Sequence, residues 1–125
     1  MSRIDIIGQN GNEGEHYEAT QPEVKGYDTL RRVLQDALVQ ASLGKGRERH
    51  ANDLAFDDQP MQKLIDLYGV GFAHGQAAKK MQEAQGMLLR GEIDKAIHEV
   101  LGAINYAAGA IISMKKQQQE KNNVQ

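Results

Sequence analysis

Apolar residues recur at helical spacing through the middle and end of the chain. In segment 27–43 they follow i, i+3, i+4, i+7, i+8 and i+11, a spacing that directs one stripe of an α-helix toward a core. Asp28 can cap the start of this helix, and Gly44 stands where a left-handed C-terminal cap belongs. The residues of the stripe are Leu30, Val33, Leu34, Ala37, Leu38 and Ala41.

Two shorter helices are predicted next, after a loop. Asp58 as N-cap, with Pro60 in the first turn, is a favourable helix start, and the short stripe that follows ends at Gly69. A third helix is predicted over 71–89. It can be continuous with the second helix through the glycines that separate them.

The fourth and longest predicted helix covers 92–117. Its segment 101–113, LGAINYAAGAIIS, is apolar almost all round and rich in Gly and Ala, so another backbone can approach it closely. A helix of this kind is buried on several sides, and we expect it to lie at a subunit interface of a homo-oligomer. The alternative is a central helix that the other three helices of one subunit surround.

The length of 125 residues indicates one domain, and its two ends differ from its middle. Residues 1–25 hold three glycines, one proline and a net charge of -3, which predicts a mobile or partly ordered arm, with residues 3–7 as a candidate short edge strand. Residues 118–125 are polar and low in complexity, which predicts a disordered tail. Between them, 26–117 forms the expected helical domain. The predicted fold class is all-α, a small bundle of about four helices.

Composition and charge narrow the function classes. The chain has no Cys, which excludes disulfides, thiol catalysis and Cys-type zinc sites. A formal net charge of -2 gives no reason to expect duplex nucleic acid or a membrane surface as partner. The longest apolar stretch, 100–114, is shorter than the roughly 20 residues that cross a bilayer. With no secretory segment at the N-terminus, we expect a cytoplasmic protein without a membrane partner.

Sets of catalytic residues are not evident. The four His residues do not have metal-ligand spacing, and neither a P-loop nor a G-x-S-x-G pattern occurs. Helical nucleotide pyrophosphohydrolases of the MazG type hold magnesium with E-x-x-E and E-x-x-D pairs, and the chain resembles them in size and helical character only. We expect no catalytic residue, metal or cofactor, and keep a hydrolase of that type as a minority alternative. Its carboxylates would be Glu83, Glu92, Asp94 and Glu99.

Two groups of residues are suited to a phosphate-containing small molecule. Arg binds phosphate with two hydrogen bonds, Lys binds it as a point charge, and Gln can contact a base edge or a sugar hydroxyl. A basic, glycine-bearing loop supplies Lys45, Arg47, Arg49 and His50. The third helix supplies Gln76, Lys79 and Lys80, with Phe72 one turn earlier as a stacking surface. The alternative to ligand binding by the two helix lysines is that they lie on a solvent-exposed face of the helix and form ion pairs with Glu83.

Asn105 is a polar residue within the apolar fourth helix. Burying it without a hydrogen-bond partner would cost about 1–3 kcal/mol. It therefore either fixes the register between paired helices, the interpretation we favour, or faces a ligand cavity.

Several strings carry a resemblance over about residues 44–112. GKGRERHAND, FDDQPM, GVGFAHGQAAKKMQEAQ and HEVLGAINYAAGAII resemble a family of small bacteriophage and prophage proteins, a likeness that implies no particular activity. The architecture is also similar, at the level of class, to phage sponge proteins of the anti-CBASS type. Those are small, helical and oligomeric, and they sequester immune nucleotide signals without cleaving them. No residue motif links this chain to them, so no site is transferred.

These observations favour a non-enzymatic, homo-oligomeric phage-type protein. We expect it to bind and sequester a phosphate-containing small molecule, a nucleotide immune signal, between subunits and so to counter host defence. The first alternative is a protein–protein inhibitor or adaptor module that docks on a host protein. The second is the MazG-like hydrolase.

Overall fold

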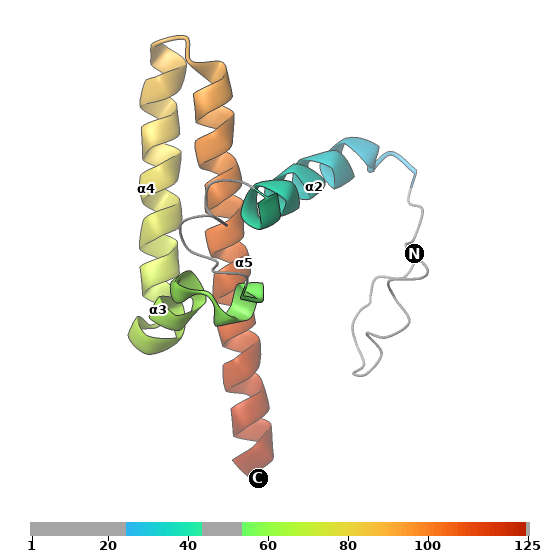
Figure 1. Cartoon of the computed structure of the whole chain (residues 1–125), viewed down its shortest axis with the longest axis vertical. Helices are drawn as coiled ribbons and strands as arrows, with labels where there is room; N and C mark the ends of the chain where they lie inside the picture. The colour runs from blue at the N-terminus through green and yellow to red at the C-terminus, as the bar shows by residue number, and fades with distance from the viewer. Residues whose placement is uncertain (1–24, 44–53, 125) are drawn as a thin grey trace. The chain divides into compact units, whose positions relative to one another are not determined.

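The computed structural model describes residues 25–43 and 54–124 (Figure 1). These residues form four α-helices and one short 3-10 helix, and no strand occurs among them. The prediction of a small all-α fold is thereby confirmed. The elements are α2 (Asp28–Leu43), η3 (Phe56–Asp58), α3 (Pro60–Tyr68), α4 (Val70–Leu89) and α5 (Ile93–Val124).

The chain divides into two compact units, residues 1–34 and 35–125. The first unit contributes the start of α2 to the described residues, and the second holds the rest of α2 and the other helices. The apolar stripe predicted to face a core along α2 is mostly exposed, since Ala37 alone of its members is buried. Helical spacing correctly predicts an amphipathic helix there, but it does not say whether a neighbour covers the stripe.

The start of α3 and its junction with α4 follow from local backbone chemistry. Gln59 is the N-cap of α3 and Pro60 is its first residue, whereas Asp58, the predicted cap, ends η3. Gly69 has a φ of 96°, which favours glycine, and its N–H donates to the carbonyl oxygen of Ile65. This residue separates α3 from α4, so the two helices are not continuous.

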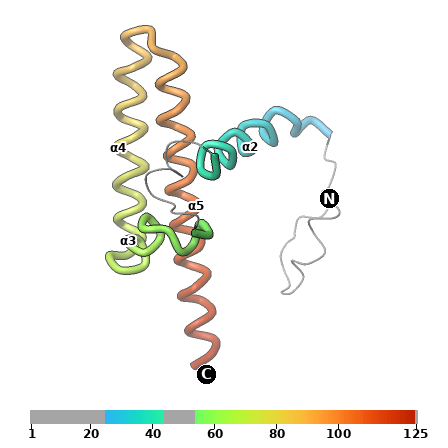
Figure 2. Tube along the Cα trace, in the orientation of Figure 1, coloured from blue at the N-terminus to red at the C-terminus, as the bar shows by residue number. Residues whose placement is uncertain are grey.

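Helices α4 and α5 form an antiparallel pair joined by a tight turn at Gly91, as Figures 1 and 2 show. Alanines line much of the contact. On α5 they recur every seven residues, as in a coiled-coil seam, and on α4 two further alanines are buried. We call the α5 set the inner seam; it comprises Ala96, Ala103 and Ala110.

Glycines of α5 are also covered within the chain. A Cβ at Gly102 would lie 3.0 Å from Cδ of Lys80 on α4, and one at Gly109 would lie 2.7 Å from Cδ1 of Ile65 on α3. The close approach expected from the small residues of 101–113 is therefore used by α3 and α4 of the same chain.

The last turns of α5 differ from the predicted disordered tail over 118–125. The helix continues to Val124 and runs on past α3 and α4 (Figure 2). Lys, Gln and Glu have high helix propensity, so a polar segment can extend a helix that packing has already nucleated.

Helix α5 is long and apolar enough to cross a membrane by length and composition alone. Of its most apolar window, 28% is buried against the rest of the structure. A core helix of a soluble protein, which is mostly buried, passes the same test, so length and composition alone do not assign α5 to a membrane.

Candidate functional site

Five of the nine predicted binding residues lie in the described part of the chain. Phe72, Gln76, Lys79 and Lys80 are on α4, and Asn105 is on α5. The other four form the basic loop and lie outside the described residues. They are Lys45, Arg47, Arg49 and His50.

Lys80 connects α4 to α5. Its Nζ lies 3.7 Å from Oε1 of Glu99 and 6.0 Å from the centre of the Tyr106 ring, at the edge of cation–π range. Its aliphatic stem covers Gly102, and the side chain is only 29% exposed. The ammonium therefore already has a carboxylate partner within the chain.

Phe72 packs edge-on against Tyr106, with 6.4 Å between ring centres and 70° between ring planes. Both rings are half-buried. Burial raises the pKa of the Tyr106 phenol above its ordinary value. The pair joins α4 to α5 near Lys80, so part of the Phe72 ring is already in contact with the chain's own tyrosine.

Lys79 is the more exposed of the two candidate lysines on α4, at 67% of its side chain. Its Nζ lies 3.9 Å from Oε2 of Glu83, which is the pairing expected for a solvated helix face. By helical spacing, Phe72, Gln76, Lys79 and Glu83 share one face of α4.

Asn105 joins α5 to α2. Its Nδ2 donates to the carbonyl oxygen of Ala37 over 3.1 Å. One turn away, Nε2 of Gln40 donates to the carbonyl oxygen of His98 over 3.2 Å. These amide-to-backbone bonds attach the C-terminal half of α2 to α5 within one chain.

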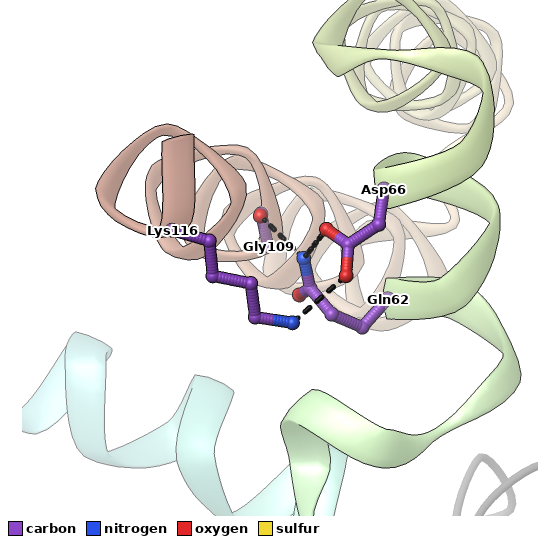
Figure 3. Close-up of polar contacts among 4 residues, drawn as sticks. All are labelled: Gln62, Asp66, Gly109 and Lys116. Atoms are coloured by element: carbon purple, nitrogen blue, oxygen red, sulfur yellow. Dashed lines mark hydrogen bonds and ion pairs between the residues drawn. The ribbon is translucent and has the colours of Figure 1, made fainter. Parts of the chain in front are cut away.

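A polar cluster between α3 and α5 is absent from the predicted set (Figure 3). Nε2 of Gln62 donates to Oδ1 of Asp66 over 3.1 Å and to the carbonyl oxygen of Gly109 over 3.0 Å. Gln62 is fully buried, and its Oε1 has no hydrogen-bond partner. Nζ of Lys116 donates to Oδ2 of Asp66 over 2.8 Å. We call these residues the polar clasp.

The clasp changes the acid–base behaviour of its two charged members. The hydrogen bond from Lys116 lowers the pKa of the Asp66 carboxyl below its ordinary value. The same bond raises the pKa of Lys116. One sequence signal pointed to the cluster, since Gln62 stands between Met61 and Ile65 at the start of an apolar stripe.

The carboxylates of the hydrolase alternative lie on α4 and α5 or just before α5, and three of them have basic partners. Glu83 pairs with Lys79, Glu99 with Lys80, and Glu92 with both Arg90 and Lys95. Among residues 25–43 and 54–124, no group of three His, Asp or Glu residues is placed to hold a metal ion.

A row of apolar side chains on α5 is largely exposed. Ile93, Ile97, Ile111 and Met114 are 57, 52, 53 and 45% exposed. Ala107 is exposed, and Val100 and Ile104 are half-buried. We call this row the outer seam; it comprises Ile93, Ile97, Val100, Ile104, Ala107, Ile111 and Met114.

Comparison with known proteins gives no match to a family model, to a curated protein or to a solved structure.

Proposed function

We propose that this chain is a non-enzymatic binding protein whose helices form a protein-interaction module. The observation that carries the proposal is the outer seam, a continuous apolar row on the longest helix. Fully burying one Ile or Met side chain stabilises a protein by about 1.5–3 kcal/mol, so a half-exposed one leaves roughly 1 kcal/mol to be gained. Several such residues on one helix make a partner that covers the row energetically favourable.

Three polar side chains that hold α5 against its neighbouring helices support a binding role over catalysis. Lys80, Asn105 and Gln62 each contact α5 or join it to another helix, and so they hold the frame on which the seam lies. A rigid helix face suits recognition, because little side-chain freedom is lost on binding.

A photo-crosslinking experiment tests this function. A photoreactive amino acid replaces Ile104 on the seam, and in a matched variant it replaces Glu120, an exposed residue of the same helix outside the heptad positions of the seam. We expect adducts with protein from Ile104, either with a second copy or with another polypeptide, and few from Glu120. Equal, low yields at both positions would refute an interaction module on this seam.

Sequestration of a phosphate-containing small molecule is the second candidate function. It is supported by the shared face of Phe72, Gln76 and Lys79 on α4, where an exposed ammonium follows an aromatic ring and an amide. The resemblance to phage proteins supplies the setting: the cytoplasm of an infected host, with a nucleotide immune signal as ligand and host defence as the process countered.

Calorimetric titration with cyclic nucleotides, ADP-ribose and inorganic phosphate tests the second candidate. We expect one of these nucleotides to bind without product release and Lys79→Ala to weaken its binding at least several-fold, while Lys121→Ala leaves it unchanged. No heat from any ligand would count against sequestration and leave the interaction module standing. Release of a cleaved nucleotide would favour the hydrolase alternative instead.

A further inference from the structure

The outer seam has the repeat of a coiled coil. Ile97, Ile104 and Ile111 are seven residues apart, and so are Ile93, Val100, Ala107 and Met114. The two series alternate at spacings of four and three, which is the a and d pattern of the heptad repeat. The pattern spans just over three heptads, the length at which it becomes indicative of a coiled coil.

This repeat is distinct from the one that packs inside the chain. The inner seam of Ala96, Ala103 and Ala110 faces α4, and all three alanines are buried. The outer seam lies on another face of α5, one that α3 and α4 leave open, and it carries the large β-branched residues. A helix with two heptad seams can pack on two neighbours, and the second unit supplies a neighbour for only one of them.

We propose that the outer seam packs against the outer seam of a second copy of this chain, with the two α5 helices antiparallel. Two α4–α5 hairpins would then form a four-helix bundle across a two-fold axis. This inference rests on the proposed function and names its partner. The exposed isoleucines would become the core of that bundle.

Charge at the two ends of the seam selects the antiparallel arrangement. Asp94 flanks the seam at its start, and Lys115 flanks it at its end, at the same heptad position. Both side chains are exposed. In an antiparallel pair, Asp94 lies beside the partner's Lys115 at both ends. In a parallel pair, the two copies of Asp94 lie on opposite sides of the seam, as do the two copies of Lys115, so neither attraction forms.

The same register pairs apolar side chains of complementary size. The antiparallel register that brings Asp94 within about half a helical turn of the partner's Lys115 places Ile104 opposite the partner's Ala107, next to the two-fold axis. It places Ile97 opposite the partner's Met114 and Val100 opposite the partner's Ile111. Every layer between the charged ends is then apolar, and the largest side chains at the centre meet the smallest.

Sedimentation equilibrium of the full chain tests the assembly. We expect a dimer at micromolar concentration, and a monomer with unchanged helical circular dichroism for Ile104→Asp. The matched control is Leu89→Asp, which changes an exposed leucine outside the seam and should remain dimeric. A wild-type chain that stays monomeric at 100-fold higher concentration would overturn the proposal, as would a dimer that survives Ile104→Asp. Should Ile104→Asp lose helix, Ile97→Gln replaces it.

Disulfide trapping tests the orientation, and the absence of native Cys keeps it unambiguous. Chains with Ile97→Cys are mixed with chains carrying Met114→Cys and oxidised. We expect mixed dimers to be trapped at least tenfold more than dimers of either variant alone, because the two positions share a layer only when the helices are antiparallel. Predominant trapping of each variant with itself would overturn the antiparallel arrangement.

These outcomes separate this inference from the proposed function. If the seam crosslinks only to another protein and the chain sediments as a monomer, the proposed interaction module stands. The second copy is then rejected as its partner. A monomer that binds phospholipid vesicles through the seam would reject both.

Discussion

Nζ of Lys116 lies 2.8 Å from Oδ2 of Asp66, and this contact ties the C-terminal half of α5 to α3. The Asp66 side chain also accepts a hydrogen bond from the buried Gln62. A partly exposed ion pair is thereby linked to an amide that is completely buried. Substitutions of the ion pair and of the amide can therefore be tested separately.

The first prediction concerns acid stability. The folded-state pKa of Asp66 is lowered from its ordinary value of 3.8, so the pair stabilises the fold above that pH and its contribution is lost as the pH falls through the folded-state pKa. Because both groups are partly exposed, we expect Asp66→Asn to reduce the free energy of unfolding at pH 7 by no more than about 1 kcal/mol. Urea unfolding should show the difference shrinking between pH 5 and pH 2.

Lys116 gives the alkaline counterpart. Its pKa is raised in the folded state, so its contribution is present below its ordinary value of 10.5 and is lost as the pH rises through the folded-state pKa.

The acid experiment on Asp66 also has a contradicting outcome. A difference in unfolding free energy between Asp66→Asn and wild type that is constant from pH 2 to pH 7 would show that the ion pair does not contribute.

The second prediction concerns the amide of Gln62. Its Nε2 donates to two acceptors, so Gln62→Glu would place a carboxylate against a carboxylate and a carbonyl oxygen. We expect a loss of more than about 3 kcal/mol at pH 7, partly recovered at low pH as the new carboxyl becomes protonated. Gln62→Met keeps the volume without the charge and should cost less. Equal thermal unfolding of the two variants would contradict the geometry.

The third prediction compares two glycines on helices. A Cβ at Gly109 would lie 2.7 Å from Cδ1 of the buried Ile65, whereas nothing lies within 4 Å of one at Gly75. Gly75→Ala should therefore stabilise the protein by about 0.5–1 kcal/mol, and Gly109→Ala should destabilise it by about 1 kcal/mol or more. Adding Ile65→Val to Gly109→Ala removes the clashing methyl group and should recover part of the loss in urea unfolding.

The fourth prediction separates the charge of Lys80 from its stem. Lys80→Met keeps a chain of carbon atoms over Gly102 but leaves Glu99 unpaired, at a cost of about 1–3 kcal/mol. Glu99→Gln added to Lys80→Met should restore much of that stability. Lys80→Ala should be worse than Lys80→Met, because it also uncovers the helix contact at Gly102. Thermal unfolding of wild type, Lys80→Met, Glu99→Gln and the double variant forms a double-mutant cycle, to which Lys80→Ala adds one control.

Helical spacing predicted the existence and approximate bounds of α2, α3, α4 and α5, because amphipathic stripes and glycine breaks are local properties. Two features were not local. The glycines of α5 suggested a close approach, but periodicity cannot tell whether the approaching backbone belongs to the same chain. The end of α5 was expected to be disordered from its polarity, although its residues are good helix formers.

Prediction of the candidate site was limited for a related reason. Lys79, Lys80 and Asn105 were singled out by residue type, and the structure gives each of them a partner that a linear pattern does not specify. Gln62 was overlooked because a single polar residue in an apolar stripe resembles a surface position. The basic loop, residues 45–50, lies outside the described residues, so its ligand remains a prediction.

A core lined by alanine has a consequence for how the protein can vary. Ala73, Ala84, Ala96, Ala103 and Ala110 are all nearly inaccessible, and each already has the smallest side chain that keeps helix propensity high. Every substitution there except glycine adds volume, so it would act by pushing helices apart, and glycine would weaken the helix itself. Natural drift in this protein should therefore spare these alanines, while the spacing between the two helix axes stays fixed.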